Sequence, residues 1–400
     1  MGARHARAGA PVRDQKEILM KHVALNTRLW AAVLVPALLS AASLAADAQE
    51  VVKIGFSSPL SGPQASSGTD NRDGLLLAVK ELNAKGVQVG GQKVSFDVVA
   101  EDDAGDPRQG VAVAQKLADA KVRYVVGPYN SGVAIPAGRI YNEAGMVMLT
   151  VGSNPKLTEL GYPRLFRVGG NDVQVGTAMA VYAAKEMKVK NVAVVDDRTA
   201  YGQGLVAEFV AEAKRQGLNI VKQEFTTDKA TDFTAILTAI RGAKPDAVVY
   251  GGYSAQSGPL LRQMVALGLQ AKLLGGDAIC DTETSRLSGG VADGRVICMR
   301  AGGLIEKSEA GRAFIAKYKA AYQRDPLTYA ANFYDAAMLI ADAMQKAGST
   351  DPGKVADQIA KGSYKGVAAE YSFTAKHDLK SSPVSVYVFK GSQPTALSSF

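Results

Sequence analysis

The sequence predicts an α/β protein built from two doubly wound Rossmann-like lobes. From Glu50 onward, apolar runs rich in β-branched residues alternate with amphipathic helical patterns, which is typical of strands and helices that build parallel sheets. About nine strands over roughly 350 residues are too many for one small sheet. Since no low-complexity linker or short repeat separates the lobes, we expect brief crossover segments to join them and to act as the hinge.

In the first part of the chain, each predicted strand is followed by a helix. Gly90 and Gly91 form a hairpin signal before the apolar segment KVSFDVVAEDD. Asp106 is a predicted N-cap, with Pro107 at the first helical position. Strands are expected at 51–58, 93–103, 122–127 and 147–152, and helices at 70–86, 106–122 and 131–145.

The second part of the chain repeats this alternation and then changes character. Strands are expected at 191–197, 219–225, 246–252, 272–276 and 295–299, and helices at 172–187, 202–217, 230–244 and 258–268. The last hundred or so residues are mostly helical. They are predicted to form helices at 309–323, 329–348 and 351–362, followed by short strands at 371–374 and 384–390.

The N-terminus has the pattern of an export signal. A basic region from Met20 to Arg28 precedes the apolar run Leu29 to Leu44, and Ala46-Asp47-Ala48 offers a signal-peptidase site. The apolar run is too short and too rich in small residues for a membrane span. Residues 1–48 are therefore predicted to be a signal peptide with an N-terminal extension at 1–19, cleaved near Ala48 for release into the periplasm. The start codon is Met1 or Met20.

Composition excludes several classes of function. Without residues 1–48, which hold six Lys/Arg and three Asp/Glu, 40 basic and 35 acidic residues remain, a net +5. These charges are scattered, so a nucleic-acid footprint is absent. His377 is then the only histidine, which makes Ser-His, Cys-His and His-metal sites poor candidates, and it is expected in an exposed turn. Neither a cofactor nor a metal is expected; the acidic pairs at 102–103 and 196–197 suit strand ends and helix starts.

Two cysteines remain for an oxidising compartment. Cys280 and Cys298 each end an apolar segment, so neighbouring strands could bring them together in a disulfide. The alternative is a pair of buried free thiols.

The loops at the predicted strand ends are the candidate binding segments. The stretch GPYNSGVAIP, residues 127–136, follows a β-branched run and places Asn130 and Ser131 at the start of a helix. Free N–H groups and the positive end of a helix dipole suit a small anion, although 127–138 contains no Lys, Arg or His. None of these loops is a P-loop or a GxGxxG motif.

Taken together, the loop motifs resemble the periplasmic leucine/isoleucine/valine-binding proteins of ABC transporters. The similarity lies in SGP, NAKG, EDDAGDP, GPYNS, SNPKLT, DDRTAYGQG, TDKATDFTAIL, YGGY and LLRQMVALGL, which occur in order over nearly the whole chain after residue 48. The resemblance implies a type I periplasmic binding protein fold. Lobe 1 would comprise 49–169 plus 302–383, and lobe 2, which closes over the ligand, 170–301 plus 384–400.

The resemblance also implies roles for particular residues. The ligand carboxylate would be held by Ser131 and the turn Gly152-Ser153, and the ammonium by that turn and Asp277. Tyr201 and Tyr253 would close over the ligand, and Tyr329 would contact its side chain. The alternatives are plain structural roles: Ser131 as a helix cap, Asp277 as a turn residue or the partner of an arginine, and the tyrosines as rim or core residues.

Three departures from the family pattern are evident. Ser67 stands where one branch has an aromatic residue, and the turn TVGSNPKLT is one residue shorter than in that branch. Gly105 and Asn130 occupy the positions of the first-lobe disulfide. The first two departures bear on which ligand side chain is selected.

The resemblance implies that the protein is not an enzyme. It would bind an L-amino acid, most favourably Leu, Ile or Val, by lobe closure, and deliver it as a monomer to the permease of an ABC transporter. One alternative is another small amino-acid-like, amide or aromatic acid ligand, and another is a periplasmic sensor. A secreted hydrolase is the third; it would need a base other than His377.

Overall fold

The computed structural model describes residues 50–399, so the predicted signal peptide lies outside the described residues. The first sheet has the strand order β2-β3-β1-β4-β5-β6. All neighbouring strands run parallel except the hairpin β2–β3, whose turn is Gly90-Gly91 as predicted. Its strands are β1 (Glu50–Ser58), β2 (Gln88–Val89), β3 (Gln92–Asp102), β4 (Tyr124–Val126), β5 (Val147–Thr150) and β6 (Leu165–Arg167).

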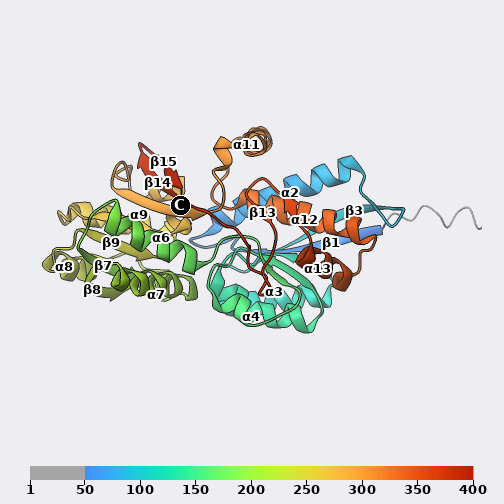
Figure 1. Cartoon of the computed structure of the whole chain (residues 1–400), viewed down its shortest axis with the longest axis horizontal. Helices are drawn as coiled ribbons and strands as arrows, with labels where there is room; N and C mark the ends of the chain where they lie inside the picture. Colours follow the sequence, from blue (N-terminus) through green and yellow to red (C-terminus); the bar gives the residue numbers. More distant parts are fainter. Residues whose placement is uncertain (1–49, 400) are drawn as a thin grey trace, which may run out of the picture. The chain divides into compact units, whose positions relative to one another are not determined.

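Helices lie against this sheet from early and late parts of the chain (Figure 1). The prediction of a capped helix with Pro107 at its first position is confirmed, since Asp106 accepts hydrogen bonds from the backbone of Arg108 and Gln109. α2 packs against α12, and α3 packs against α4. The helices are α2 (Ala65–Lys85), α3 (Pro107–Asp119), α4 (Ser131–Glu143), α5 (Lys156–Glu159), α11 (Glu309–Tyr322), α12 (Ala330–Ala347) and α13 (Pro352–Lys361).

The second sheet has the strand order β15-β14-β11-β10-β9-β7-β8. Its five strands from the middle of the chain run parallel, whereas β14 and β15 are antiparallel, so this sheet is mixed rather than purely parallel. The strands are β7 (Asn191–Asp196), β8 (Asn219–Phe225), β9 (Ala247–Gly251), β10 (Lys272–Gly275), β11 (Val296–Ala301), β14 (Val384–Lys390) and β15 (Gln393–Ser399).

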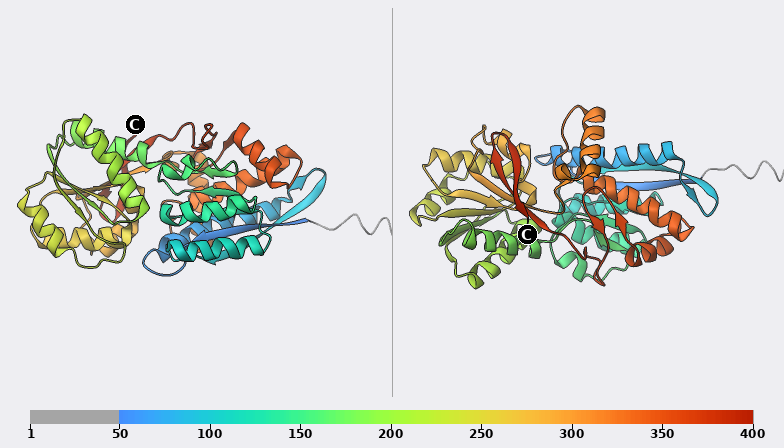
Figure 2. Two further views of the ribbon diagram at one scale, coloured as in Figure 1. Left: turned by 90° about the horizontal axis from the view of Figure 1, so that it is seen from below. Right: turned by 45° about the horizontal axis from the view of Figure 1, so that its top comes forward.

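Helices also flank the second sheet, as the two views of Figure 2 show. They are α6 (Asp172–Lys185), α7 (Ala200–Arg215), α8 (Thr234–Gly242), α9 (Ser254–Ala266) and α10 (Thr282–Leu287), with the 3₁₀ turns η1 (Asp277–Ile279) and η2 (Ile305–Lys307). A separate two-stranded sheet pairs β12 (Tyr364–Lys365) with β13 (Glu370–Tyr371). The α/β class and the two wound sheets are as predicted.

Some element boundaries differ from the prediction. α2 begins at Ala65 rather than at residue 70, because Gly68 lets the helix pass close to Pro59: a Cβ there would lie 1.7 Å from the Pro59 carbonyl oxygen. The strand predicted at 371–374 is reduced to β13 and an isolated bridge between Phe373 and Leu379. β6, α10 and β15 were not predicted.

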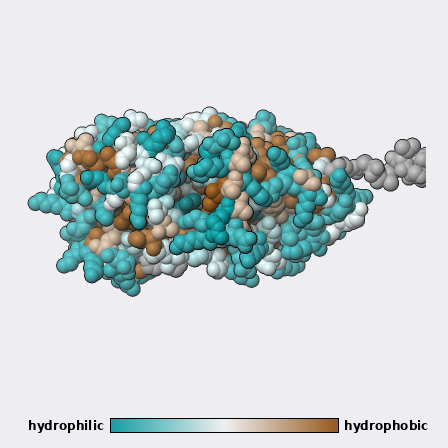
Figure 3. All heavy atoms as spheres, turned by 90° about the horizontal axis from the view of Figure 1, so that it is seen from above, coloured by the Kyte–Doolittle hydropathy of each residue, from teal (hydrophilic) through white to brown (hydrophobic). Residues whose placement is uncertain are grey.

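The chain passes between the two sheets three times, after β6, after β11 and before β14. These crossings agree with brief connections, while the exact lobe bounds 49–169 plus 302–383 and 170–301 plus 384–400 stay a prediction. Apolar side chains are divided among three buried clusters, and the face in Figure 3 shows only small separate apolar areas among hydrophilic ones. Among residues 50–399, no helix is both long and apolar enough to cross a membrane.

Candidate ligand-binding site

Loops that follow strands of both sheets meet around one small cavity. The loop after β4 brings Tyr129 and Ser131, and the loop after β5 brings Ser153. From the second sheet, α7 brings Tyr201 and η1 brings Asp277. The arrangement follows the rule that open α/β sheets bind ligands beyond the carboxyl ends of their strands. The cavity is lined by Tyr129, Ser131, Val151, Ser153, Tyr201, Tyr253, Asp277, Ala278 and Tyr329.

Most of the predicted binding residues line this cavity. The six that do are Ser131, Ser153, Tyr201, Tyr253, Asp277 and Tyr329. Gly152 lies between two lining residues without lining the cavity itself, and Ser67 lies on the first turn of α2. The cavity volume is about 10 Å³, close to the space that one water molecule needs.

The first side of the cavity offers hydrogen-bond donors without a countercharge. Ser131 is the first residue of α4, and its Oγ accepts a hydrogen bond of 3.1 Å from the backbone N–H of Asn154. The Ser131 hydroxyl proton therefore stays available for an acceptor in the cavity. Asn130 holds the N-cap position as predicted, but its side chain donates to Gln64 and does not cap the helix.

A buried arginine that the sequence prediction missed fixes the loop after β5. Arg167 is fully buried on β6; its Nη1 donates to the carbonyl of Gly152, and its Nη2 donates to that of Asn154 at 3.0 Å. Its Nε pairs with Asp378 at 2.6 Å. Because the guanidinium holds two carbonyls of this loop from behind, the Ser153 side chain is left facing the cavity. The only signal in the sequence was a basic residue within the apolar segment LFRVG.

A second buried group behind this loop is Asp172, at the start of α6. Burial raises the pKa of its carboxyl to about 8, although the neighbouring Ser153 hydroxyl acts to lower it. Its Oδ2 has no hydrogen-bond partner within the described part of the chain. A carboxyl that is mostly neutral at pH 7 adds little negative charge to the Ser153 loop, so it does not repel an anion there.

The opposite side of the cavity carries a buried carboxylate. Asp277 is 3% exposed; its Oδ1 accepts a hydrogen bond from Tyr201 Oη at 3.1 Å, and its Oδ2 accepts one from Tyr329 Oη at 2.5 Å. Burial raises the pKa of Asp277, while the two tyrosine hydroxyls oppose this by hydrogen bonding. Over residues 50–399 no Lys, Arg or His forms an ion pair with it. Asp277 can therefore accept a cation from a ligand.

Tyrosine rings form the remaining wall. The ring of Tyr129 lies 5.8 Å from that of Tyr253 and 5.7 Å from that of Tyr329, and Tyr201 lies 5.2 Å from Tyr253, measured between centroids. Burial raises the pKa of Tyr129, and the nearby Ser67 hydroxyl lowers it. Ser67 thus reaches the site through Tyr129. The sequence prediction missed Tyr129, although it lies in the GPYNS motif.

Direct contacts cross between the loops of the two sheets. The side-chain amide of Asn154 donates to the Ala200 carbonyl at 2.6 Å, and the Tyr129–Tyr253 contact also links the loops of the two sheets. These contacts join the loops of the two sheets beside the cavity. An amino acid is far larger than one water molecule, so these contacts have to open before it can enter.

Three other sequence predictions can be compared with the structure. Cys280 and Cys298 form a disulfide that joins the end of η1 to β11 and so fastens the Asp277 segment. Gly105 faces Asn130, since a Cβ at Gly105 would lie 3.6 Å from Asn130 Oδ1. His377 is in a turn but is half-buried rather than exposed, because its ring stacks on Phe166 at 4.3 Å.

Within residues 50–399, no group of three or more His, Cys, Asp or Glu is arranged to hold a metal ion. The acidic pairs at 102–103 and 196–197 instead accept hydrogen bonds from neighbouring backbone N–H groups.

Comparison with known proteins places this geometry among binding proteins. Residues 51–393 match the family described as periplasmic binding protein. An amino acid binding protein of Pseudomonas aeruginosa is 34% identical over 357 residues, which are 89% of this chain and 94% of that protein. A leucine-, isoleucine-, valine-, threonine- and alanine-binding protein of the same organism is 32% identical, and the match covers 90% of this chain and 95% of that protein. Among solved structures, this chain resembles LivJ, the branched-chain amino acid transporter substrate binding protein of Streptococcus pneumoniae, in complex with isoleucine. The TM-score is 0.79 and the sequence identity 28%, and the match covers 88% of this chain and 99% of that chain.

Proposed function

Because this chain belongs to the periplasmic binding protein family, we propose that it captures an L-amino acid, most favourably Leu, Ile or Val, and delivers it to the permease of an ABC transporter. One observation carries the proposal. Uncharged donors at Ser131 and the Ser153 loop face the buried carboxylate of Asp277, which forms no ion pair within residues 50–399. That pairing suits a zwitterion, whose carboxylate and ammonium are neutralised on opposite sides. The names of the two relatives and the isoleucine complex support the ligand class.

In the proposed complex, each end of the ligand has its own partners. The carboxylate accepts hydrogen bonds from the Ser131 hydroxyl, the Gly152-Ser153 turn and the N-terminus of α4. The ammonium replaces the tyrosine hydroxyls on Asp277 or shares the carboxylate with them. The side chain lies against Tyr129, Tyr253 and Tyr329, together with Val151 and Ala278.

The proposed mechanism is closure of two lobes over the ligand. The ligand docks on Ser131 and the 152–153 turn while the lobes are apart, and Asp277, Tyr201 and Tyr253 then close over it. Ligand shifts the population toward the closed form because contacts from both sides exist only there. The closed surface formed by both lobes is the one that the permease recognises in this proposal. The lobes are 49–169 plus 302–383 and 170–301 plus 384–400.

The family also bears on where the protein acts and on its mature form. Membership implies a periplasmic location and a role in binding rather than catalysis. In our proposal, residues 1–48 are removed as a signal peptide, and the mature protein acts as a monomer without a cofactor.

A thermal-shift titration tests the proposed function. The protein is unfolded and refolded to remove bound ligand, then titrated with the twenty L-amino acids, their small amides and benzoate. A ligand at about a thousand times its Kd should add roughly 4 kcal/mol to the free energy of unfolding, a shift of several degrees. We expect selective shifts with Leu, Ile or Val; a shift with benzoate alone would contradict the role of Asp277.

Substitution of Asp277 is the matching test on the protein. Asp277→Ala should weaken amino-acid binding by well over tenfold, on the order of 2–5 kcal/mol, because a buried ammonium would be left unpaired. Asp357→Ala serves as the control, since Asp357 is exposed on α13. Nearly equal affinities of the two variants in isothermal titration calorimetry would overturn the assignment.

A further inference from the structure

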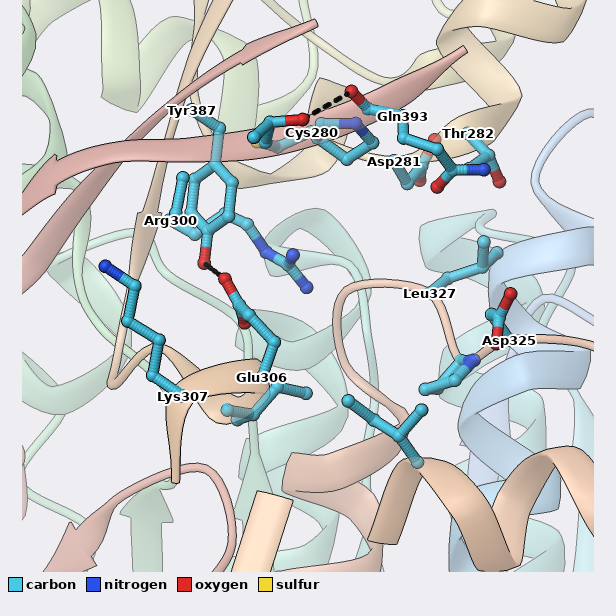
Figure 4. Close-up of a pocket in the computed structure, with 16 residues that line it drawn as sticks. Cys280, Asp281, Thr282, Arg300, Glu306, Lys307, Asp325, Leu327, Tyr387 and Gln393 are labelled. Atoms are coloured by element: carbon cyan, nitrogen blue, oxygen red, sulfur yellow. Dashed lines mark hydrogen bonds between the residues drawn. The ribbon is translucent and has the colours of Figure 1, made fainter. Parts of the chain in front are cut away.

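A larger cavity lies apart from the ligand-binding site. It has a volume of about 420 Å³ and shares no lining residue with the central cavity. Figure 4 shows its walls, which come from the end of β11, η2, α11, the loop at 325–327 and the β14–β15 hairpin. Small-molecule sites span roughly 300–1,000 Å³, so this cavity has the size of one.

A guanidinium without an anionic partner points into this cavity. Figure 4 shows the end of Arg300 directed into the open space between Glu306 and Leu327. Its Nη2 donates to the Thr328 carbonyl at 3.3 Å, and its Cζ lies 5.2 Å from the centre of the Tyr387 ring. Over residues 50–399 no ion pair joins Arg300 to a carboxylate. A positive charge on an aromatic face is therefore available to an anion.

The neighbouring carboxylates of residues 50–399 act on Arg300 from a distance without forming an ion pair with it: burial raises the pKa of both Asp277 and Asp281, and the guanidinium acts to lower it. Asp325 pairs with Lys319 at 3.1 Å. Asp281 caps α10 and accepts a hydrogen bond from Ser254 Oγ at 2.8 Å. Glu306 remains, next to the Tyr387 hydroxyl at 3.5 Å, and faces two cations, Arg300 and Lys307. Arg300 and Lys307 therefore balance Glu306 and Asp281 in number, and what the cavity offers an anion is a guanidinium that no carboxylate of residues 50–399 contacts directly.

The rest of the lining is apolar. Ile305, Ile315 and Leu327 contribute aliphatic surface from three separate segments. Pro326, Pro394 and the ring of Tyr387 add flat, rigid surface. An occupant therefore gains by burying an apolar body while it presents one negative group to Arg300.

We propose that this cavity is a second ligand site, which takes a monocarboxylate with an apolar body, such as an arylalkyl acid. The carboxylate binds Arg300, and the apolar body lies between Ile315, Leu327 and the Tyr387 ring. An ammonium is not required here, which separates this ligand class from that of the central site.

Isothermal titration calorimetry with 3-phenylpropionate on the full chain tests the proposal, with 3-phenylpropanamide as the uncharged match. The acid should bind and the amide should bind at least about tenfold more weakly, because only the acid can pair with Arg300. Arg300→Gln should weaken binding of the acid about tenfold or more. Ile315→Trp, which fills the cavity without changing its charge, should abolish binding.

The central site is excluded by repeating the titration on Ser131→Ala, which removes a proposed carboxylate donor of the central site and lines no part of the second cavity. Binding of the acid should persist in that variant, whatever becomes of amino-acid binding, so failure of this proposal and of the proposed function are distinguishable. Melting curves check that Arg300→Gln and Ile315→Trp fold. The second site would be overturned by any one of four results: no binding of the acid at millimolar concentration, equal binding of acid and amide, unweakened binding in a folded Ile315→Trp or Arg300→Gln, or loss of binding in Ser131→Ala.

Discussion

The hydroxyl of Ser131 can serve two partners at once. It accepts the N–H of Asn154, which fixes the oxygen, and its proton is then directed by whichever acceptor lies in the cavity. The same hydrogen bond ties the start of α4 to the loop after β5. One side chain thus both shapes the anion site and supplies a donor to it.

Removal of this hydroxyl should weaken ligand binding. Ser131→Ala deletes the proposed hydrogen bond to the ligand carboxylate, which costs about 1–2 kcal/mol, or a factor of about 5–30 in Kd. Isothermal titration calorimetry with leucine measures the change. Ser66→Ala, at an exposed position on α2, should leave Kd unchanged. An unaltered Kd in Ser131→Ala would remove Ser131 from the site.

Asp277 should make binding depend on pH. Burial raises its pKa above the ordinary value of an aspartate, and only the ionised carboxylate can pair with an ammonium. Protonation removes that charge, so affinity should fall as the pH drops through the raised pKa, earlier than for an exposed aspartate. Binding near that pKa should also release a proton.

The measurement is Kd by calorimetry from pH 8 down to pH 4, in buffers of different ionisation heat. Asp277→Asn should be weak throughout and nearly independent of pH. If that variant follows the same pH profile as the original protein, the titrating group is a different one.

Site residues within a recognisable loop motif could be predicted from the sequence, whereas contacts between distant parts of the chain could not. Ser131, Ser153 and Asp277 lie in loops that follow strands, and the family resemblance of those loop motifs assigned them to one site; all three line one cavity. Arg167 and Asp378 could not be paired in advance, because the contact joins positions 211 residues apart. Likewise, nothing in the sequence indicates that the ring of Tyr129 contacts the rings of Tyr253 and Tyr329.

At the level of elements, β6 supports the binding loop rather than the ligand. It is short, and its last residue, Arg167, holds the carbonyls of Gly152 and Asn154 while it pairs with Asp378 from the segment after β13. β4 is equally short but lies in a β-branched run, whereas β6 ends in a basic residue, and β6 was missed for that reason. β15 was missed because its residues are mostly polar or small.

Replacing this arginine should destabilise the protein and loosen the site. Arg167→Met removes a fully buried charge and leaves two carbonyls and Asp378 without their donor, a loss of about 3–5 kcal/mol in the free energy of unfolding. Urea denaturation measures it. Asp378→Asn should cost less, because the Asp378 side chain is 21% exposed and water can replace part of the pair. Equal stability of Arg167→Met and the original protein would show that the network does not support the loop.

At the scale of the whole molecule, the three crossings between the sheets touch one another at a single glycine. A Cβ on Gly170 would lie 2.0 Å from the Cβ of Ala301 and 3.2 Å from Ser382 Oγ, and these residues belong to the three separate crossings. The backbone N–H of Gly302 also donates to the Pro383 carbonyl at 2.8 Å. The number of strands predicted two sheets, but no local pattern predicts that 170, 301 and 382 pack together, because such contacts depend on the whole fold.

If these crossings form the hinge, crowding them should disfavour the closed arrangement described here. Gly170→Ala places a methyl group where none fits, so the segments at 168–171 and 301–304 must separate, at a cost of about 1–3 kcal/mol. Because ligand binds by closure in our proposal, that cost should appear as an increase in Kd for leucine and as a smaller decrease of the radius of gyration on ligand addition in X-ray scattering. Gly242→Ala is the matched control, since a Cβ there meets nothing within 4 Å. Ala301→Gly in the Gly170→Ala background removes the opposing methyl group and should restore affinity; a double variant as weak as Gly170→Ala would show that the steric contact between these crossings does not govern closure.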